Sequence, residues 1–209
     1  MNIEYNFETT INGKLIHCRA FTLGEYLDLI KAKASGTIKD TVQKILKDCT
    51  DAVDLPKHES ELLLVRLWAH SLGEVSHTAI YQCECGNEIK TPLNLTYAST
   101  INTNELFYQL QGLKIKFKYP KLFDDENIGL MIASCIEYVI VGTEQIFFDD
   151  LSEAEIQDLY SAITVEDVKN ISEMLLEATI QISVPISCTC GKNHVQTITG
   201  LKEFFRIIQ

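Results

Sequence analysis

The stretch "YQCECGNEIK", residues 81–90, is echoed more than a hundred positions later by "ISCTCGKNHV", residues 186–195. Each contains Cys-x-Cys-Gly between residues typical of β-strands. The two motifs supply four cysteines, which are Cys83, Cys85, Cys188 and Cys190. Four thiolates are the number that a closed tetrahedral zinc site uses, at Zn–S distances of about 2.3 Å. We therefore predict that the two motifs fold as knuckles that share one structural zinc ion.

The glycine after each cysteine pair supports this interpretation. A knuckle must turn sharply so that both sulfurs face one ion, and Gly86 and Gly191 can take the positive φ angles that such a turn needs. One alternative is that the four cysteines are half-buried and hold no metal. A redox pair is another alternative, but it usually places Cys-x-x-Cys at the start of a helix. His194 could replace a thiolate, lie beside the ligands or be an ordinary strand residue, and the sequence leaves these three roles open.

The separation of the motifs predicts what the metal does. Two half-sites so far apart can share one ion only if the two parts of the fold meet there. The ion would then be a long-range cross-link. Because the complete site is absent from the unfolded chain, its binding energy would stabilise the folded one.

Composition limits the classes of function. The chain has 209 residues, of which 46% are hydrophobic, and a formal net charge of −11 without a dense cluster of Lys or Arg. Nucleic acid is therefore not an expected partner. No apolar run approaches the roughly 20 residues of a membrane-spanning helix, and the first residues lack the features of a signal peptide. We expect a soluble protein of a reducing cytoplasm, in which the seven cysteines are not a disulfide framework.

The first third of the chain predicts a hairpin followed by helices. Residues 3–21 alternate between apolar and polar around Asn12-Gly13, a dipeptide typical of tight hairpin turns. We predict helices near 22–34 and 37–49, the first with a capping box from Thr22 and Glu25 and with Leu23, Tyr26, Leu27 and Ile30 at helical spacing. A third helix is expected between Pro56 and Gly73.

Further along, residues 101–123 predict a middle β segment and residues 126–140 an apolar helix that holds Cys135. A later helix is expected to point Val165, Val168, Ile171, Leu175 and Leu176 inward. The order helix, strand, Cys-x-Cys-Gly, strand thus occurs in residues 59–98 and again in 165–201, as two pseudo-repeat halves. We predict the α+β class: one compact mixed domain over residues 1–209, with β-hairpins and a split, zinc-ribbon-like pair of knuckles.

Catalytic motifs are not found in the sequence. The five histidines match neither a two-histidine metal motif nor a nucleophile elbow, and no glycine-rich phosphate loop is present. We assign no catalytic residue and expect that the chain is not an enzyme.

Two segments carry a family resemblance. They are "PKHESELLLVRLWAHSLGE", residues 56–74, which leads to "CECG", and "EMLLEATIQISVPISCTCG", residues 173–191, which leads to "LKEFF" with Phe204 and Phe205. In these features the chain resembles the baseplate-hub assembly proteins of T-even-type contractile-tailed bacteriophages. The resemblance implies a hub subunit or an assembly chaperone that binds other baseplate hub proteins. It also implies that the protein acts in the host cytoplasm, and in the tail baseplate if it stays in the particle.

Two other classes compete with this interpretation. One is an intracellular thiol-dependent enzyme, and the other is a zinc-ribbon adaptor protein. The sequence does not say which hub protein is bound, whether the chain remains in the mature particle, or what its oligomeric state is.

Overall fold

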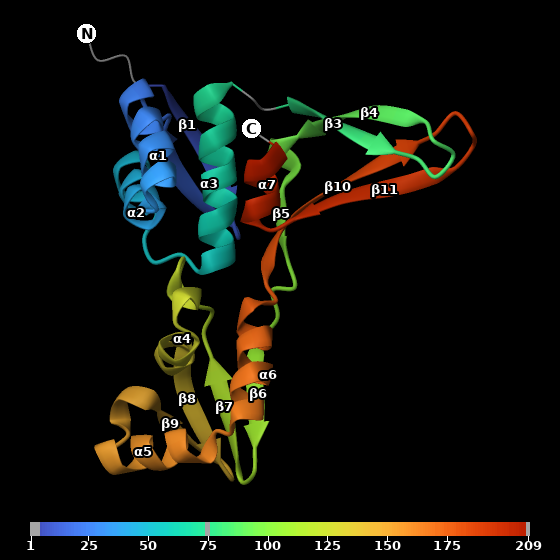
Figure 1. Cartoon of the computed structure of the whole chain (residues 1–209). Coiled ribbons are helices and arrows are strands. Elements are labelled where there is room, and N and C mark those ends of the chain that lie inside the picture. Colours follow the sequence, from blue (N-terminus) through green and yellow to red (C-terminus); the bar gives the residue numbers. More distant parts are fainter. Residues whose placement is uncertain (1–4, 74–75, 208–209) are drawn as a thin grey trace. The chain divides into compact units, whose positions relative to one another are not determined.

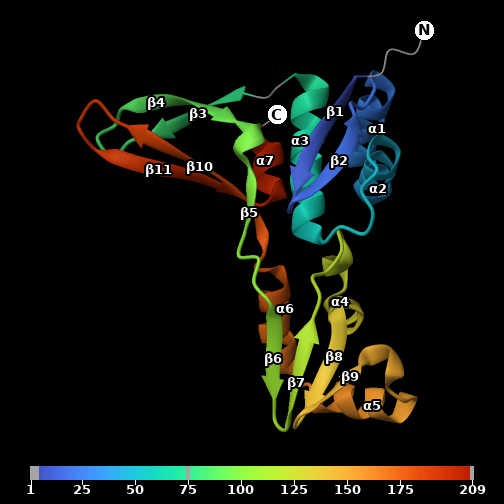
Figure 2. The same ribbon diagram turned by 180° about the vertical axis from the view of Figure 1, so that it is seen from behind.

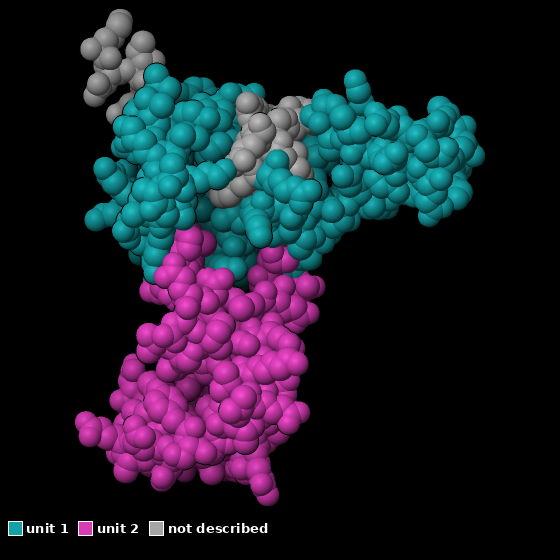
Figure 3. Space-filling view, viewed as in Figure 1, with its two compact units in different colours: residues 1–101, 180–209 teal, residues 102–179 magenta. Residues whose placement is uncertain are grey.

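The computed structural model describes residues 5–73 and 76–207. They form two compact units, one of residues 1–101 with 180–209 and the other of residues 102–179 (Figure 3). Each unit mixes helices and strands, which confirms the predicted α+β class. The prediction of one domain over residues 1–209, with pseudo-repeat halves at 59–98 and 165–201, stays a prediction. No helix in the described ranges has both the length and the apolar character needed to cross a membrane.

The first unit begins with the predicted hairpin. Strands β1 (Asn6–Ile11) and β2 (Lys14–Arg19) pair antiparallel, and the residues between them have φ angles of 46° and 76°. Glycine at the second position of such a turn avoids steric strain, because it has no Cβ to collide with the backbone at positive φ. Ile11 and Ile16 are buried in this unit.

Three helices follow, close to the predicted ranges. Helix α1 (Leu23–Ser35) has the predicted capping box, in which Thr22 Oγ1 accepts from the Glu25 N–H and Glu25 Oε2 accepts from the Thr22 N–H. Helix α2 (Ile38–Cys49) comes next. Helix α3 (Lys57–Leu72) is buried over most of its length and contacts β1, β5 (Ser99–Ile101) and α7 (Leu201–Ile207).

Two long hairpins complete the first unit. One consists of β3 (Ser76–Gln82) and β4 (Glu88–Asn94), and the other of β10 (Thr179–Ser187) and β11 (Asn193–Thr199). They lie side by side with their turns at the same end (Figures 1 and 2). At the other end β5 adds to β10, in the order β11-β10-β5, and η1 (Leu95–Tyr97) contacts α3. Phe204 of α7 is buried, so the last residues of the chain complete a core begun by the first hundred.

The second unit is an antiparallel sheet covered by helices. Strands β6 (Leu106–Leu110), β7 (Leu113–Phe117), β8 (Ile136–Val141) and β9 (Glu144–Phe147) pair in chain order. The short turn η2 (Asp124–Glu126) leads from β7 to α4 (Ile128–Cys135), and η3 (Phe148–Asp150) leads from β9 to α5 (Glu153–Ala162), which α6 (Val165–Leu176) follows. The core combines both kinds of element, with Ile115, Phe117, Met131, Ile171 and Leu175 among its buried side chains.

Two expectations for this unit are wrong. The helix predicted over residues 126–140 covers only Ile128–Cys135, and the chain then becomes strand β8. The run "IEYVIV" is β-branched and aromatic, and it pairs with β7 on one side and β9 on the other, so sheet pairing decides its conformation. Val165, predicted to point inward, is 88% exposed because it is the first residue of α6.

Candidate metal centre

The two knuckles have the same backbone hydrogen bonds at equivalent positions. In the first, the Cys83 N–H donates to the Asn87 carbonyl at 2.9 Å and the Gly86 N–H donates to the Cys83 carbonyl at 2.8 Å. In the second, both corresponding bonds are 2.9 Å long and involve Cys188, Lys192 and Gly191. The two glycines have φ angles of 89° and 87°, as the sequence predicts for such turns.

The four sulfurs come together from the two hairpins. Cys83 Sγ lies 3.8 Å from Cys190 Sγ, and Cys85 Sγ lies 3.6 Å from Cys188 Sγ. All four sulfurs lie within 4.8 Å of one another. A tetrahedral site with Zn–S bonds of about 2.3 Å has sulfur–sulfur edges of about 3.8 Å, whereas a disulfide needs about 2.05 Å. The spacing therefore fits four ligands around one ion, and the cysteines are free thiols.

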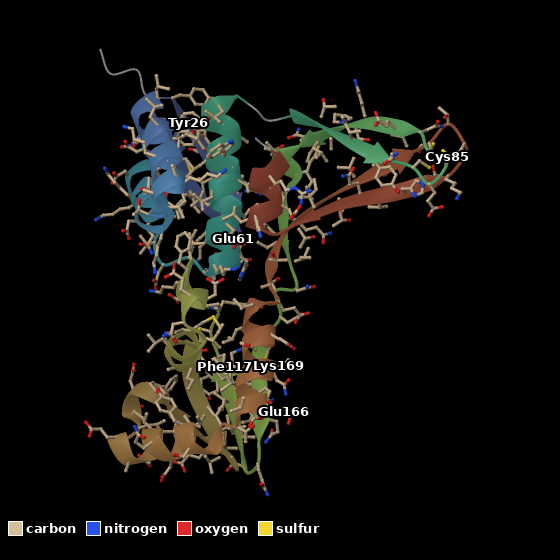
Figure 4. All side chains as sticks on the ribbon, viewed as in Figure 1. Tyr26, Glu61, Cys85, Phe117, Glu166 and Lys169 are labelled. Atoms are coloured by element: carbon tan, nitrogen blue, oxygen red, sulfur yellow. The ribbon has the colours of Figure 1, made fainter. Side chains whose placement is uncertain are left out.

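The site has a covered side and an open side. Cys83 and Cys188, the first cysteine of each motif, are buried, whereas Cys85 and Cys190 are exposed. Figure 4 shows Cys85 at the turn end of the hairpins. An ion can therefore reach the sulfurs from solvent without any rearrangement of the core.

Electrostatics at the four sulfurs favour a thiolate at one of them even without metal. The Cys190 N–H bonds to the sulfur of Cys188, and this bond together with those from the other thiols lowers the pKa of Cys188 to about 6. The Asn87 N–H acts to lower the pKa of Cys85, but hydrogen bonds from this thiol to the neighbouring sulfurs, with some loss of hydration beside them, raise it to about 12. A bound cation would remove this difference between the two thiols, because every coordinating thiol loses its proton.

His194 lies beside the sulfurs. Its Nε2 is 3.5 Å from Cys83 Sγ, and its ring packs against Tyr81 with 5.2 Å between ring centroids. The imidazole reaches the first knuckle from β11, so it contacts the hairpin opposite its own. The group of ligand atoms close enough to hold one ion consists of the four sulfurs.

Two more contacts join the knuckles, and neither could be predicted from the sequence. The Asn87 side-chain amide donates to Thr189 Oγ1 at 3.0 Å and to Cys188 Sγ at 3.8 Å. Lys192 Nζ forms an ion pair with Glu84 Oε2 at 2.7 Å. Their partners lie more than a hundred residues away, so only the register between the hairpins brings them together.

The three remaining cysteines differ from the knuckle cysteines in their burial and in their pKa. Cys18, Cys49 and Cys135 are buried, and burial is the main cause that raises the pKa of each to about 11. Such thiols are poor nucleophiles and poor metal ligands. Within residues 5–73 and 76–207, the four knuckle cysteines are the cluster of His, Cys, Asp or Glu side chains positioned to hold a metal.

Comparison with known proteins identifies the class. The model of the family described as "T4 bacteriophage base plate protein" matches residues 2–206, and the chain belongs to this family. A curated relative, the baseplate hub assembly protein gp26 of Enterobacteria phage T4, is 52% identical over 206 residues, which cover 98% of this chain and 99% of the relative. The family resemblance carried by the two cysteine motifs is thereby confirmed. No solved structure matches the chain.

Proposed function

We propose that this chain is a non-enzymatic assembly protein of the phage tail baseplate hub, either a hub subunit or an assembly chaperone, and that it acts through contacts with other hub proteins. One observation carries the proposal. The 52% identity to the T4 hub assembly protein extends over nearly the full length of both chains, so both units of the fold are shared.

A structural zinc ion held by Cys83, Cys85, Cys188 and Cys190 is part of the proposal. The support is the sulfur spacing of 3.6 and 3.8 Å, together with an all-sulfur donor set of the kind that selects zinc. When bound, the ion supplies a closed four-coordinate cross-link. The chain's own residues orient the sulfurs: the glycine turns set the direction of each pair, and Asn87 bridges the two knuckles.

His194 acts, in this proposal, as a hydrogen-bond donor to the Cys83 thiolate and does not replace a ligand. The 3.5 Å separation suits an N–H···S contact, and Tyr81 holds the ring in place. A partner of this kind fixes the orientation of a ligand and raises metal affinity.

The thiol-enzyme alternative has one observation in its favour, the lowered pKa of Cys188. However, this side chain is only 7% exposed and has other sulfurs around it, as a metal ligand does and a catalytic thiol does not. Timed alkylation separates the two. A zinc site predicts one zinc per chain and four thiols that react slowly until a chelator is added. A single fast-reacting cysteine in a metal-free protein would support the enzyme.

The adaptor alternative predicts binding to nucleic acid that strengthens as salt is lowered. The net charge of −11 argues against such binding. We propose other baseplate hub proteins as the partners, met in the host cytoplasm during assembly and in the tail baseplate if the chain stays there.

Deletion of the gene from the phage that encodes the chain, with rescue from a plasmid, tests the assembly role. Loss of complete baseplates, with the other tail proteins still synthesised, supports it, and normal baseplates without the chain would refute it.

Comparison of pull-downs from infected cells with the protein inventory of purified tails then separates a hub subunit from an assembly chaperone. A subunit is present in both, and a chaperone is absent from the tails.

A further inference from the structure

Helix α1 has apolar side chains on two opposite faces. Toward the unit's interior, Leu29 and Ala32 are buried, and Tyr26 packs on Trp68 with 5.9 Å between ring centroids. Figure 4 shows Tyr26 on the side of α1 that faces α3. On the other side, Leu23, Leu27 and Ile30 are 73%, 46% and 47% exposed, and Ala34 is exposed as well. We call the second group, Leu23, Leu27, Ile30 and Ala34, the α1 stripe.

The spacing of the α1 stripe is that of a helix-packing seam. Its members follow one another at intervals of four, three and four residues. This is the a and d pattern by which one helix packs along another. Over this interval the seam is about 16 Å long, at a rise of about 1.5 Å per residue. The core side chains lie on another face of the helix, so the stripe keeps about half or more of its leucine and isoleucine surface in solvent.

Charges beside the stripe indicate what would cover it. Lys31 and Lys33 follow Ile30 by one and three positions, which puts one lysine on each side of the stripe at the e and g positions of the heptad. Both are exposed. Lys31 also forms an exposed ion pair with Asp28, one turn earlier on the same helix, at 3.9 Å, and such a surface pair is weak enough for an acidic partner to compete for the lysine.

We propose that the α1 stripe is the docking surface for an amphipathic helix of another protein, one whose apolar seam is flanked by acidic residues. That the other protein is a baseplate component rests on the assembly function proposed above. Acidic residues on the incoming helix would pair with Lys31 and Lys33 and would fix its register.

A second copy of this chain is a poorer occupant. In a parallel pair of α1 helices, Lys31 at e would face Tyr26 at the g position of the other copy, and Lys33 at g would face a position beyond the end of that helix, so neither lysine would meet an acidic residue. In an antiparallel pair they would lie opposite Gly24 and Tyr26 and gain no partner.

Binding in vitro can be measured with defined probes and the full chain. One peptide has about four heptads with Leu at a and d and Glu at e and g, and the other has Lys in place of Glu. The acidic peptide should bind at least tenfold more tightly. Leu27→Glu with Ile30→Glu should weaken it by about a hundredfold, because burial of each side chain is worth about tenfold or more. Val165→Glu, at another exposed apolar helix position, should change nothing. Equal binding of both peptides, or of the stripe variant and the parent, would overturn the proposal.

Site-specific photo-crosslinking at position 27 in infected cells tests the surface in its own setting, with a probe at Lys44 of α2 as control. The proposal requires crosslinks from position 27 to an acidic amphipathic helix of another protein. Crosslinks to a second copy, or none, would overturn it.

Plasmid rescue of the gene deletion separates the two proposals. If the parent and Val165→Glu rescue but the stripe variant fails while remaining folded, both proposals stand. If all three rescue, the docking surface fails alone, and if the parent itself proves dispensable, the assembly function fails.

Discussion

Removal of one knuckle's sulfurs should do nearly the same damage as removal of all four. The variants are Cys83→Ser with Cys85→Ser, Cys188→Ser with Cys190→Ser, and the combination of all four. Each leaves the ion with half its ligands or none, so each opens the same cross-link. Groups that act as a unit give non-additive losses, and here the second pair of substitutions should add little to the first.

The size of the loss follows from the loop that the metal closes. Cys85 and Cys188 are 103 residues apart. In the chain-entropy model, a cross-link over about 100 residues stabilises the folded state by about 4.7 kcal/mol. For a chain of about this size, 1 kcal/mol corresponds to about 2–4 °C in Tm. All three variants should therefore melt roughly 10–20 °C below the parent.

Calorimetry with and without a chelator is the assay. The chelator should lower the parent to the Tm of the variants and leave the variants unchanged. Glu84→Ala with Lys192→Ala is the matched control, because it removes an exposed ion pair between the same knuckles and should cost less than about 1 kcal/mol. Losses that add between the two motifs, in a parent indifferent to chelator, would refute the shared site and favour four independently packed thiols.

Three further predictions concern single residues. His194→Phe should keep the packing on Tyr81 but lose the N–H···S contact, and zinc affinity measured by chelator competition should fall about 10- to 100-fold; unchanged affinity would remove His194 from the site. Gly86→Ala and Gly191→Ala should each destabilise the chain by about 1 kcal/mol in denaturant titration, through backbone strain alone, because φ is 89° and 87° and no atom lies within 4 Å of the added Cβ. Gly24→Ala, in the first turn of α1 and away from positive φ, is the control and should not destabilise. The hydrogen bonds from Arg19 hold the pKa of Glu25 at about 2, below its ordinary value of 4.5. The unfolded chain therefore binds this proton first as pH falls, so the contribution of Glu25 to stability is complete above about pH 4.5 and is lost toward pH 2. Compared at each pH in chelator, Glu25→Gln should cost on the order of 2 kcal/mol at pH 6 and little near pH 2, and a difference independent of pH would contradict this.

Local signals in the sequence were enough to predict most of the elements near the site. The Asn12-Gly13 turn, the capping box of Thr22 and Glu25 and the glycines of both knuckles each act within a few residues, and the structure has all of them. The four-sulfur cluster could also be predicted, because the motif occurs twice and one site needs four ligands.

Features that depend on distant pairing could not be predicted in the same way. The switch from helix to strand after Cys135 is decided by β7 and β9, and an apolar run alone fits either conformation. The bridge from Asn87 to Thr189 depends on how one hairpin lies on the other. Helix α1 shows a third case. Its apolar pattern correctly predicts a helix, but it does not reveal that Leu23, Leu27 and Ile30 face solvent, because a core face and a docking face have the same period.

The mass of the intact chain under native conditions tests the shared metal site most directly. A shared site predicts a species with one zinc ion per chain for the parent, and loss of that ion in either two-cysteine variant as well as in the four-cysteine variant. An ion retained by a single knuckle, two ions per chain, or a parent that binds no zinc after refolding in its presence would each contradict it.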